Sequence, residues 1–258
     1  MKPSNLLWPV GLGLCLVFML GPLVLVVLFS FGTNALIGFP MGGLTLAWYE
    51  RLLADASFLA AFRTSLLVAA ATAIIATATG TLAAFAIARA SPALAHWSLA
   101  LVSVPVLLPP LVIAIAIVVL FVRGIGVGLG VPVVVLGHVL VTQPFVILVV
   151  LARLATFPMA SVEAARDLGA TRWQAFRLVT LPQIASALIG AALIAASISL
   201  DDFIIASFTL GGGNTLSTFV WGKIRTTLDP SINAIATILL VLTVGMSVLA
   251  LRLARYRG

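Results

Sequence analysis

Charge is scarce in this sequence, and negative charge is scarcest. Only 8% of the 258 residues are charged and 7 are acidic, whereas 62% are hydrophobic and the mean hydropathy is +1.27. A soluble domain carries about 25% charged residues, so this chain has too little charge to cover a surface that faces water. The composition argues against a soluble enzyme, and against a disordered segment, which needs low hydrophobicity and high charge.

Cysteine and histidine are nearly absent as well. The single cysteine, Cys15, lies in an apolar run, which excludes an intrachain disulfide and a thiolate metal cluster. His96 and His138 are far apart in the sequence, so each is predicted to lie at the membrane interface or to pack between helices. The run Gly211–Gly213 is not followed by the Gly-Lys-Ser/Thr of a phosphate loop. We therefore predict no metal site, no cofactor and no catalytic residue.

Six long apolar runs predict membrane-spanning helices, because a span needs about 20 mostly apolar residues to cross a hydrocarbon core about 30 Å thick. The first run could instead be a secretory signal, since Lys2 precedes it. It is longer than the apolar core of a signal, about 7–15 residues, and is not followed by a small-residue cleavage site. The sequence thus predicts an all-α membrane protein, a six-helix bundle in one domain, 1–258. The predicted spans are 7–31, 65–88, 98–121, 133–152, 184–208 and 232–251.

The basic residues predict the orientation of these spans. The net charge of +7 does not indicate nucleic acid, because the 14 basic residues are too scattered to form a phosphate-binding face. Six spans put both termini on one side, and positive loop charge marks the cytoplasm. With cytoplasmic termini, the inner segments hold Lys2, Arg89, Arg153, Arg166, Arg172, Arg177, Arg252, Arg255 and Arg257. The outer segments hold the smaller set Arg51, Arg63, Arg123, Lys223 and Arg225. Both termini are therefore predicted to be cytoplasmic.

Proline interrupts several predicted spans and predicts kinks there. Pro105 and the pair Pro109–Pro110 lie in the third span, and Pro144 lies in the fourth. Small residues, Gly80 among them, are dense in the second span and favour close helix packing. We interpret these residues as shaping the bundle rather than as contacts for a substrate.

The longest inner loop, 153–183, carries a pattern that a disordered loop would lack. Ser161 is predicted to cap a short helix over Val162–Leu168. Gly169 is predicted to end it, because helices often end on a glycine in the left-handed region. Thr171 is predicted to cap a second short helix that carries the large apolar residues Trp173, Phe176 and Leu178. Two short helices with a tight bend would suit docking into a partner; the alternative is that the loop lies among lipid head groups.

This loop resembles the EAA loop of ABC importer permeases. The resemblance rests on Glu163-Ala164-Ala165, on Gly169 four residues later, and on Leu181-Pro182 before the next span. It covers most of the chain, from Trp48-Tyr49 to Asn233-Ala234, and within the family the chain resembles spermidine/putrescine permeases of the PotC and PotI type. The residues behind this closer likeness are Glu163–Gly169, Ser199-Leu200-Asp201-Asp202, Ser207-Phe208 and the segment Asn233–Leu239.

The resemblance implies a type I ABC importer permease, half of an ATP-driven import path for a small solute such as a polyamine. It implies that the cytoplasmic loop is a coupling helix seated on an ATPase, with Glu163, Ala164, Ala165, Arg166, Asp167 and Gly169 as contact or bend residues. The partners it implies are two ATPase copies, a second permease, an external binding protein and the bacterial inner membrane. The chain itself would be no enzyme and would bind no ATP.

Asp201 and Asp202 are the acidic residues inside a predicted span. Counted from the start of that span, they lie about 26 Å along it, in the outer half of the membrane. Intramembrane carboxylates normally face a cavity and mark a pathway, and they would suit a cationic substrate. The alternatives are interfacial anchoring or a capped break in the helix. We predict a pathway role, with at most one of the two facing the cavity squarely.

Other functions remain open from the residues alone. A secondary transporter is possible, although it would have no ATPase for the loop to engage and would usually show internal repeats. An intramembrane enzyme would need a nucleophile and a base placed side by side. The sequence spacing gives no reason to expect His138 next to Asp201 or Asp202. Within ABC importers, iron, phosphonate or thiamine are alternative solutes.

Overall fold

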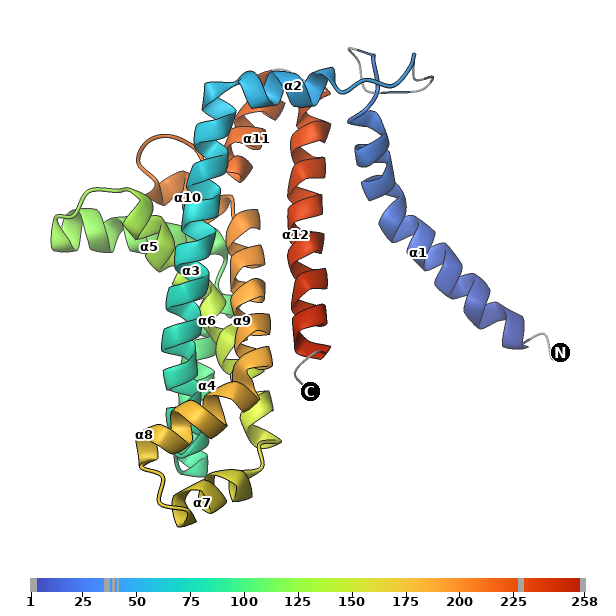
Figure 1. Cartoon of the computed structure of the whole chain (residues 1–258). Coiled ribbons are helices and arrows are strands. Elements are labelled where there is room, and N and C mark those ends of the chain that lie inside the picture. Colours follow the sequence, from blue (N-terminus) through green and yellow to red (C-terminus); the bar gives the residue numbers. More distant parts are fainter. Residues whose placement is uncertain (1–3, 35–37, 39, 41, 227–229, 256–258) are drawn as a thin grey trace. The chain divides into compact units, whose positions relative to one another are not determined.

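The structure is a computed structural model that describes residues 4–34, 38, 40, 42–226 and 230–255. Helices dominate these residues, and the β-structure seen among them is one antiparallel bridge between Gly32 and Leu44. Lys2 and Arg257, which entered the charge count, lie outside the described residues. The helices (Figure 1) are α1 Ser4–Phe29, α2 Ala47–Ala54, α3 Ala56–Ala88, α4 Pro92–Leu107, α5 Pro110–Val118, η1 Val119–Ile125, α6 Val131–Ala155, α7 Met159–Asp167, α8 Arg172–Ala175, η2 Phe176–Thr180, α9 Leu181–Asp201, α10 Ile204–Thr209, α11 Leu216–Thr226 and α12 Ser231–Arg255. The segments η1 and η2 are π-helical.

The chain forms two compact units. Unit 1 comprises Met1–Leu59 and Phe219–Thr243, and unit 2 comprises Ala60–Thr218 and Val244–Gly258. In unit 1, polar contacts tie the end of α1 to α2. The indole Nε1 of Trp48 donates to the carbonyl of Gly32 at 2.7 Å, and the hydroxyls of Ser30 and Tyr49 lie 2.7 Å apart.

The core of unit 2 is built on α3, α6 and α9, with α5 and α10 packed at one end. Small side chains make this packing close, as the sequence of the second span predicts. Ala76 and Ala84 of α3 meet Val146 and Val150 of α6 and Ala191 of α9, all buried. A second cluster joins α5, α6 and α10 through Ile113, Ala114, Ile117, Val133 and Ile205. These contacts fix the α9–α10 junction, where the Asp pair lies.

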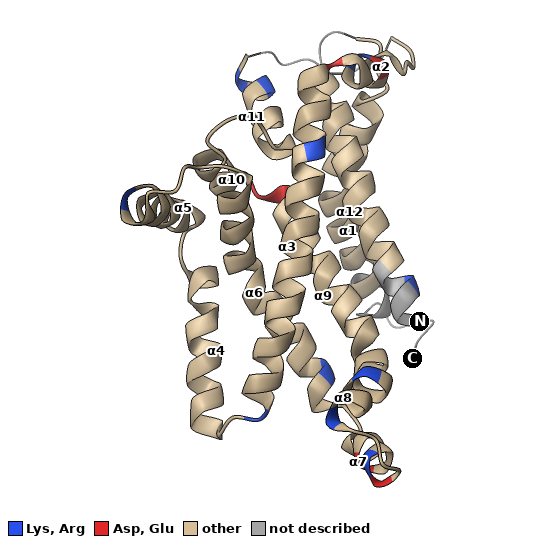
Figure 2. Cartoon of the chain, turned by 60° about the vertical axis from the view of Figure 1, so that its left-hand side comes forward, with Lys and Arg blue, Asp and Glu red and all other residues tan. Residues whose placement is uncertain are grey.

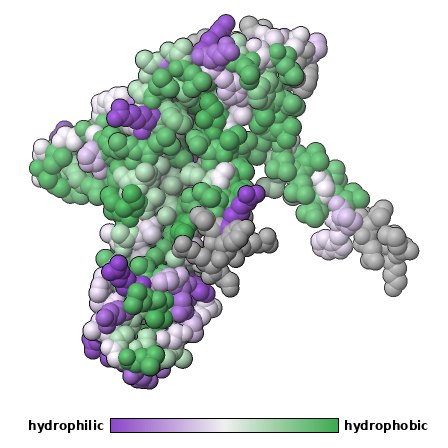
Figure 3. Space-filling view, in the orientation of Figure 1, coloured by the Kyte–Doolittle hydropathy of each residue, from purple (hydrophilic) through white to green (hydrophobic). Residues whose placement is uncertain are grey.

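The long helices have the length and composition of membrane spans. Among the described residues, five helices are long and apolar enough to cross, and a bent pair would make a sixth. Large apolar side chains remain exposed on them; on α3, Ile74 is 70% and Leu82 is 71% exposed. In Figure 3, apolar residues cover the long helices, whereas hydrophilic residues gather over the α7–α8 end. Such a surface suits lipid rather than water.

The predicted third span, 98–121, is not one straight helix. Helix α4 begins at Pro92, ends at Leu107, and is followed by α5 and η1 at an angle of 96°. The physical cause is the proline pair, because a residue before proline is pushed out of the α region. Leu108 (ψ 142°) and Pro109 (ψ 132°) are both extended accordingly. Pro105 and Pro144, in contrast, lie inside continuous helices.

The predicted fifth span, 184–208, is also interrupted. Helix α9 ends at Asp201, Asp202 is extended with ψ 119°, and α10 begins at Ile204. The helix also begins earlier than predicted, at Leu181, where it continues directly from η2 with Thr180 and Leu181 both in the α region.

Close packing around Gly137 of α6 gives a first testable result. A Cβ at this position would lie 2.6 Å from Cγ2 of Ile205, which is fully buried and has no room to turn away. We expect Gly137→Ala to lower the midpoint of thermal unfolding in detergent, because overpacking costs about 1–3 kcal/mol. Gly190→Ala in α9 is the matched control, since its Cβ would meet no atom within 4 Å. An unchanged midpoint for Gly137→Ala would contradict this description of the core.

Candidate functional site

The first candidate site is the break between α9 and α10. The carboxylate of Asp202 accepts hydrogen bonds from the backbone N–H groups of Ile205 (2.9 Å) and Ala206 (3.2 Å). These are amides of the first turn of α10, which have no partner within the helix. Asp202 therefore acts as a helix cap, which is the alternative that the sequence left open beside the pathway role.

Asp202 also meets His138, a residue that the sequence did not relate to it. His138 of α6 is 2% exposed, and its Nε2 lies 3.3 Å from Oδ1 of Asp202, at ion-pair distance but without the alignment of a hydrogen bond. Its Nδ1 lies 2.7 Å from the hydroxyl of Ser199 in α9, and that hydroxyl lies 3.5 Å from Oγ1 of Thr72 in α3. A buried polar network thus connects α3, α6 and α9 to the α9–α10 break.

The order Ser199, His138, Asp202 is that of a catalytic triad, but the environment does not fit hydrolysis. Ser199 is 5% exposed and its hydroxyl is shared with Thr72, so a substrate carbonyl has no access to it. One oxygen of Asp202 is occupied by the amides of α10. This network instead holds three helices in register around a helix break. No group of three or more His, Cys, Asp or Glu suitable for a metal occurs among the described residues.

Asp201 differs from its neighbour. It is the last residue of α9 and is exposed. Among the described residues, it has no salt bridge or hydrogen bond through its carboxylate, whereas Asp202 has both kinds of partner. The other acidic residues of the described part lie in or beside α2 and in α7 (Figure 2). Of the two carboxylates at this break, Asp201 is the exposed one and Asp202 is the one held by neighbouring groups.

The second candidate site is the loop that carries the EAA-like motif, at the other end of α9. Helix α7 ends at Asp167, and Gly169 two residues later has φ +89°, so a left-handed glycine terminates the helix as the sequence predicts. The N–H of Ala170 donates to the carbonyl of Ala165 at 3.0 Å, and the N–H of Gly169 donates to Arg166 at 3.0 Å. These bonds close the helix end in the manner of a Schellman motif, which places a glycine in the left-handed region. The chain turns sharply there.

The second short helix has the cap predicted for it. Thr171 and Gln174 form a reciprocal capping box, in which the N–H of Thr171 donates to Gln174 Oε1 at 2.8 Å and the N–H of Gln174 donates to Thr171 Oγ1 at 3.3 Å. The prediction that Ser161 caps the first helix is wrong. Helix α7 begins at Met159, with Pro158 before it, and Ser161 lies inside its first turn. The proline sets the start because its fixed φ suits a helix entry.

One side of the loop packs against α3, α6 and α9, and its other side is exposed. The guanidinium of Arg153 donates from Nε and Nη2 to the carbonyl of Gln183 at 3.1 and 2.8 Å, which joins the end of α6 to the start of α9. Phe176 packs edge-on against Phe85 of α3 at 5.9 Å. Among the motif residues, Glu163, Ala164, Arg166, Asp167 and Gly169 are exposed, and Ala165 is partly buried. The two short helices α7 and α8, called the docking knob below, thus form a fixed projection with an exposed face, which suits docking onto another protein.

The two sites lie far apart. Helix α9, which separates them, has 21 residues, about 30 Å at 1.5 Å per residue. One end of α9 therefore carries an exposed carboxylate, and the exposed loop with the EAA-like motif lies at the other end. Residues 76–257 match the family described as the binding-protein-dependent transport system inner membrane component, and the chain belongs to this family.

Individual relatives refine this assignment. The chain is 34% identical over 230 residues to the putrescine transport system permease protein PotI of Escherichia coli K12. The alignment covers 86% of this chain and 82% of that protein. It is 31% identical over 236 residues to the spermidine/putrescine transport system permease protein PotC of the same strain, covering 91% of this chain and 88% of that protein. This confirms the resemblance found in the sequence.

Solved structures confirm the fold class. A bacterial ABC transporter involved in the import of the acidic polysaccharide alginate aligns with a TM-score of 0.75 at 18% identity, over 99% of this chain and 96% of that one. The MetNI methionine ABC transporter aligns with a TM-score of 0.57 at 18% identity, over 75% of this chain and 94% of that one. At such identities the likeness carries the fold and not the solute. As a member of the family matched by residues 76–257, the chain is a transport permease and not an enzyme.

Proposed function

We propose that this chain is a permease subunit of an ATP-driven importer for a polyamine such as putrescine or spermidine. The observation that carries the proposal is the similarity to PotI and PotC over more than four fifths of each of them. A sulfate permease of Chlamydomonas reinhardtii is also similar, at 28% over 56% of that protein. The polyamine permeases match at higher identity and over more of their length.

The charge at the α9–α10 break supports a cationic solute. Asp201 offers a carboxylate without a partner among the described residues, at the end of a helix that crosses the membrane. A carboxylate and an ammonium group form a charge-assisted hydrogen bond, which is about twice as strong as a neutral one. Sulfate, phosphonate or another anion would be repelled at this position. In this proposal Asp201 contacts the solute, and Asp202 holds the break in place.

The α7–α8 loop supports ATP-driven transport over an ion-driven carrier. In the proposal, Glu163 pairs with a basic or amide group on a cytoplasmic ATPase, and Gly169 provides the bend between the docking helices. Ala164 and Ala165 keep the contact face small, and Asp167 adds charge at its edge. ATP is bound by the ATPase, and closure of two ATPase subunits moves the docked knob with them. A secondary transporter has no use for such a knob.

The complete transporter in this proposal contains more than this chain. One loop engages one ATPase subunit, so two ATPase copies need a second permease, and an external binding protein delivers the polyamine. The loop and both termini face the cytoplasm of a bacterial inner membrane. In unit 2, the basic residues at the ends of α3 and α6 and in α7, α8 and η2 gather at one end (Figure 2), which is the cytoplasmic side by the positive-inside rule.

Uptake in cells tests the solute. We expect deletion of the gene to abolish energy-dependent uptake of radiolabelled putrescine or spermidine, and expression of the chain with its neighbouring transport genes to restore it. Unlabelled polyamine should compete for this uptake, whereas thiamine, phosphonate and ferric iron should not. Restored uptake of one of those solutes, with none of either polyamine, would contradict the polyamine assignment and leave the permease assignment intact.

A further inference from the structure

A pocket lies behind the α7–α8 loop, on the side that faces α3. It has a volume of about 560 Å³, within the range of about 300–1,000 Å³ common for ligand pockets. Its walls come from the end of α3, from α7, and from α8 with η2. Thr81, Leu82, Phe85, Arg89, Met159, Val162, Arg166, Arg172, Ala175, Phe176 and Thr180 line it.

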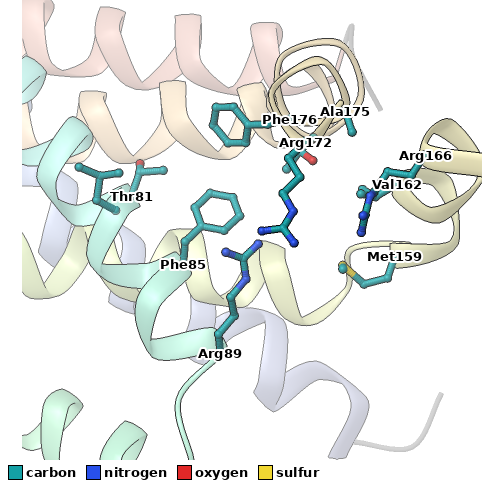
Figure 4. A pocket seen from close by; sticks show the side chains of 11 residues that line it. Thr81, Phe85, Arg89, Met159, Val162, Arg166, Arg172, Ala175 and Phe176 are labelled. Carbon is teal, nitrogen blue, oxygen red and sulfur yellow. The ribbon is translucent and has the colours of Figure 1, made fainter. Parts of the chain in front are cut away.

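Positive charge dominates the polar part of this pocket. Arg89, Arg166 and Arg172 line it, and no lining residue is acidic. Figure 4 shows Arg89 and Arg172 directing their guanidinium groups into the same space, with Phe85 beside Arg89. The centre of the Arg89 guanidinium lies 5.9 Å from the Phe85 ring. In the described part of the chain, none of the three arginines has a carboxylate within ion-pair distance. Two guanidinium groups that point into one space without a counter-charge, with a third arginine on the wall, favour an anion between them.

A second observation points to a ligand with acceptor oxygens. The hydroxyl of Thr81, which also lines the pocket, is buried and finds no hydrogen-bond partner among the described residues. A buried polar group without a partner is costly. The planar guanidinium matches a phosphate group in two-point contacts. The phosphate of an ester satisfies the arginines, whereas the Thr81 hydroxyl, eight residues or about 12 Å before Arg89 along α3, would need an oxygen elsewhere on the same ligand.

The apolar part of the pocket and its depth in the membrane indicate the source of that phosphate. Helix α3 has 33 residues, about 50 Å in length, which exceeds a hydrocarbon core of about 30 Å. Arg89, just beyond its last residue, therefore reaches the head-group level, while Leu82 one to two turns earlier is 71% exposed on the lipid-facing surface. Phe85, Met159 and Val162 line both this pocket and an adjoining one of about 300 Å³.

We propose that this pocket binds an anionic phospholipid, with its phosphate on Arg89 and Arg172 and its acyl chains along Leu82 and Phe85. Basic pockets at the cytoplasmic ends of membrane helices suit such head groups. The bound lipid would fill the space between α3 and the docking knob and would neutralise the arginines there. The inference rests on the pocket itself and not on the solute carried, so its test needs no transport.

Native mass spectrometry of the transporter that contains this chain, purified in neutral detergent, tests the proposal. The probes are short-chain phosphatidylglycerol, phosphatidylcholine with the same chains, and inorganic phosphate. We expect phosphatidylglycerol to remain bound at concentrations where phosphatidylcholine does not. The double variant Arg89→Gln, Arg172→Gln should bind it at least about tenfold more weakly, since each basic residue near an anionic surface contributes about fivefold. Arg177→Gln, an exposed arginine of η2 outside the pocket, is the matched control and should bind normally.

Further variants and competitors distinguish the lipid from other molecules that could bind in this pocket. Arg89→Lys with Arg172→Lys keeps the charge but loses the two-point contacts, so it should bind more weakly than wild type and clearly better than the Gln variant. Binding at this intermediate level shows that the loss in the Gln variant is not misfolding. Equal affinity for phosphatidylglycerol in wild type and the Gln variant would overturn the proposal. Displacement of the lipid by inorganic phosphate at the same concentration would assign the site to a free anion. Lipid binding that appears only after the ATPase is removed would assign the arginines to the ATPase surface.

Discussion

Replacement of Gly169 by valine is expected to abolish most of the ATPase activity that loaded binding protein stimulates. The φ of +89° is open to glycine but strained for a β-branched residue. The chain would have to leave the left-handed region, which removes the bonds that close α7 and changes the angle between the docking helices. A left-handed backbone costs an L-residue about 1–2 kcal/mol, so we expect a loss of about tenfold or more, with normal insertion in the membrane.

Gly126→Val is the matched control for this experiment. Gly126 also has a positive φ, of +74°, and a Cβ there would meet no atom within 4 Å, as at Gly169. It follows η1, outside the proposed docking surface, so stimulation should be largely retained. Glu163→Gln, which removes the charge of this exposed side chain and nearly keeps its size, should weaken stimulation as well. Normal stimulation in both the Gly169 and Glu163 variants would show that this loop does not couple the permease to ATP hydrolysis.

Asp201→Asn is expected to reduce polyamine uptake by about tenfold while the transporter still assembles. The carboxylate of Asp201 is exposed at the end of α9 and has no partner among the described residues, so its loss should leave the fold intact. A hydrogen bond to a charged group contributes about 1.5–3 kcal/mol when it is desolvated, which corresponds to tenfold or more. Asp201→Glu retains the charge and should keep part of the uptake.

Asp202 should respond differently, because its oxygen is occupied by α10 and His138. Asparagine caps a helix about as well as aspartate, so Asp202→Asn tests the loss of charge beside His138 alone. Asp202→Ala also removes the cap, at a cost of about 1 kcal/mol, and should lower thermal stability and assembly together with uptake. The measurements are uptake of radiolabelled polyamine and co-purification of the ATPase. Full uptake in Asp201→Asn would remove the carboxylate contact from the proposed pathway.

Local features of the sequence predicted local features of the structure. Gly169 ends a helix and Thr171 caps the next one because both signals act on backbone groups a few residues away. Ser161 failed as a cap because Pro158 starts the helix earlier. The pair Pro109–Pro110 indicated a kink, yet its angle of 96° depends on how α5 packs against α6 and α10.

Contacts between distant segments could not be predicted in this way. His138 and Ser199 are 61 residues apart in the sequence, and no periodicity or spacing brings α6 and α9 together at these two positions. The same holds for Arg89 and Arg172, which come together because α8 folds back toward the end of α3. A lone histidine in an apolar helix is usually a packing residue, and the sequence therefore favoured that role for His138. Its contact with Asp202 can be seen only in the three-dimensional arrangement of the helices.

Transport by the purified system is the most direct test of ATP-driven polyamine import by this chain and its partners. The chain is reconstituted in liposomes with its second permease and ATPase, with ATP enclosed on the ATPase side and loaded binding protein on the other side. We expect accumulation of labelled putrescine or spermidine that requires both ATP and the binding protein, and that is lost when an ATPase variant unable to hydrolyse ATP replaces the normal subunit. Accumulation that follows an imposed ion gradient and is indifferent to ATP would contradict it.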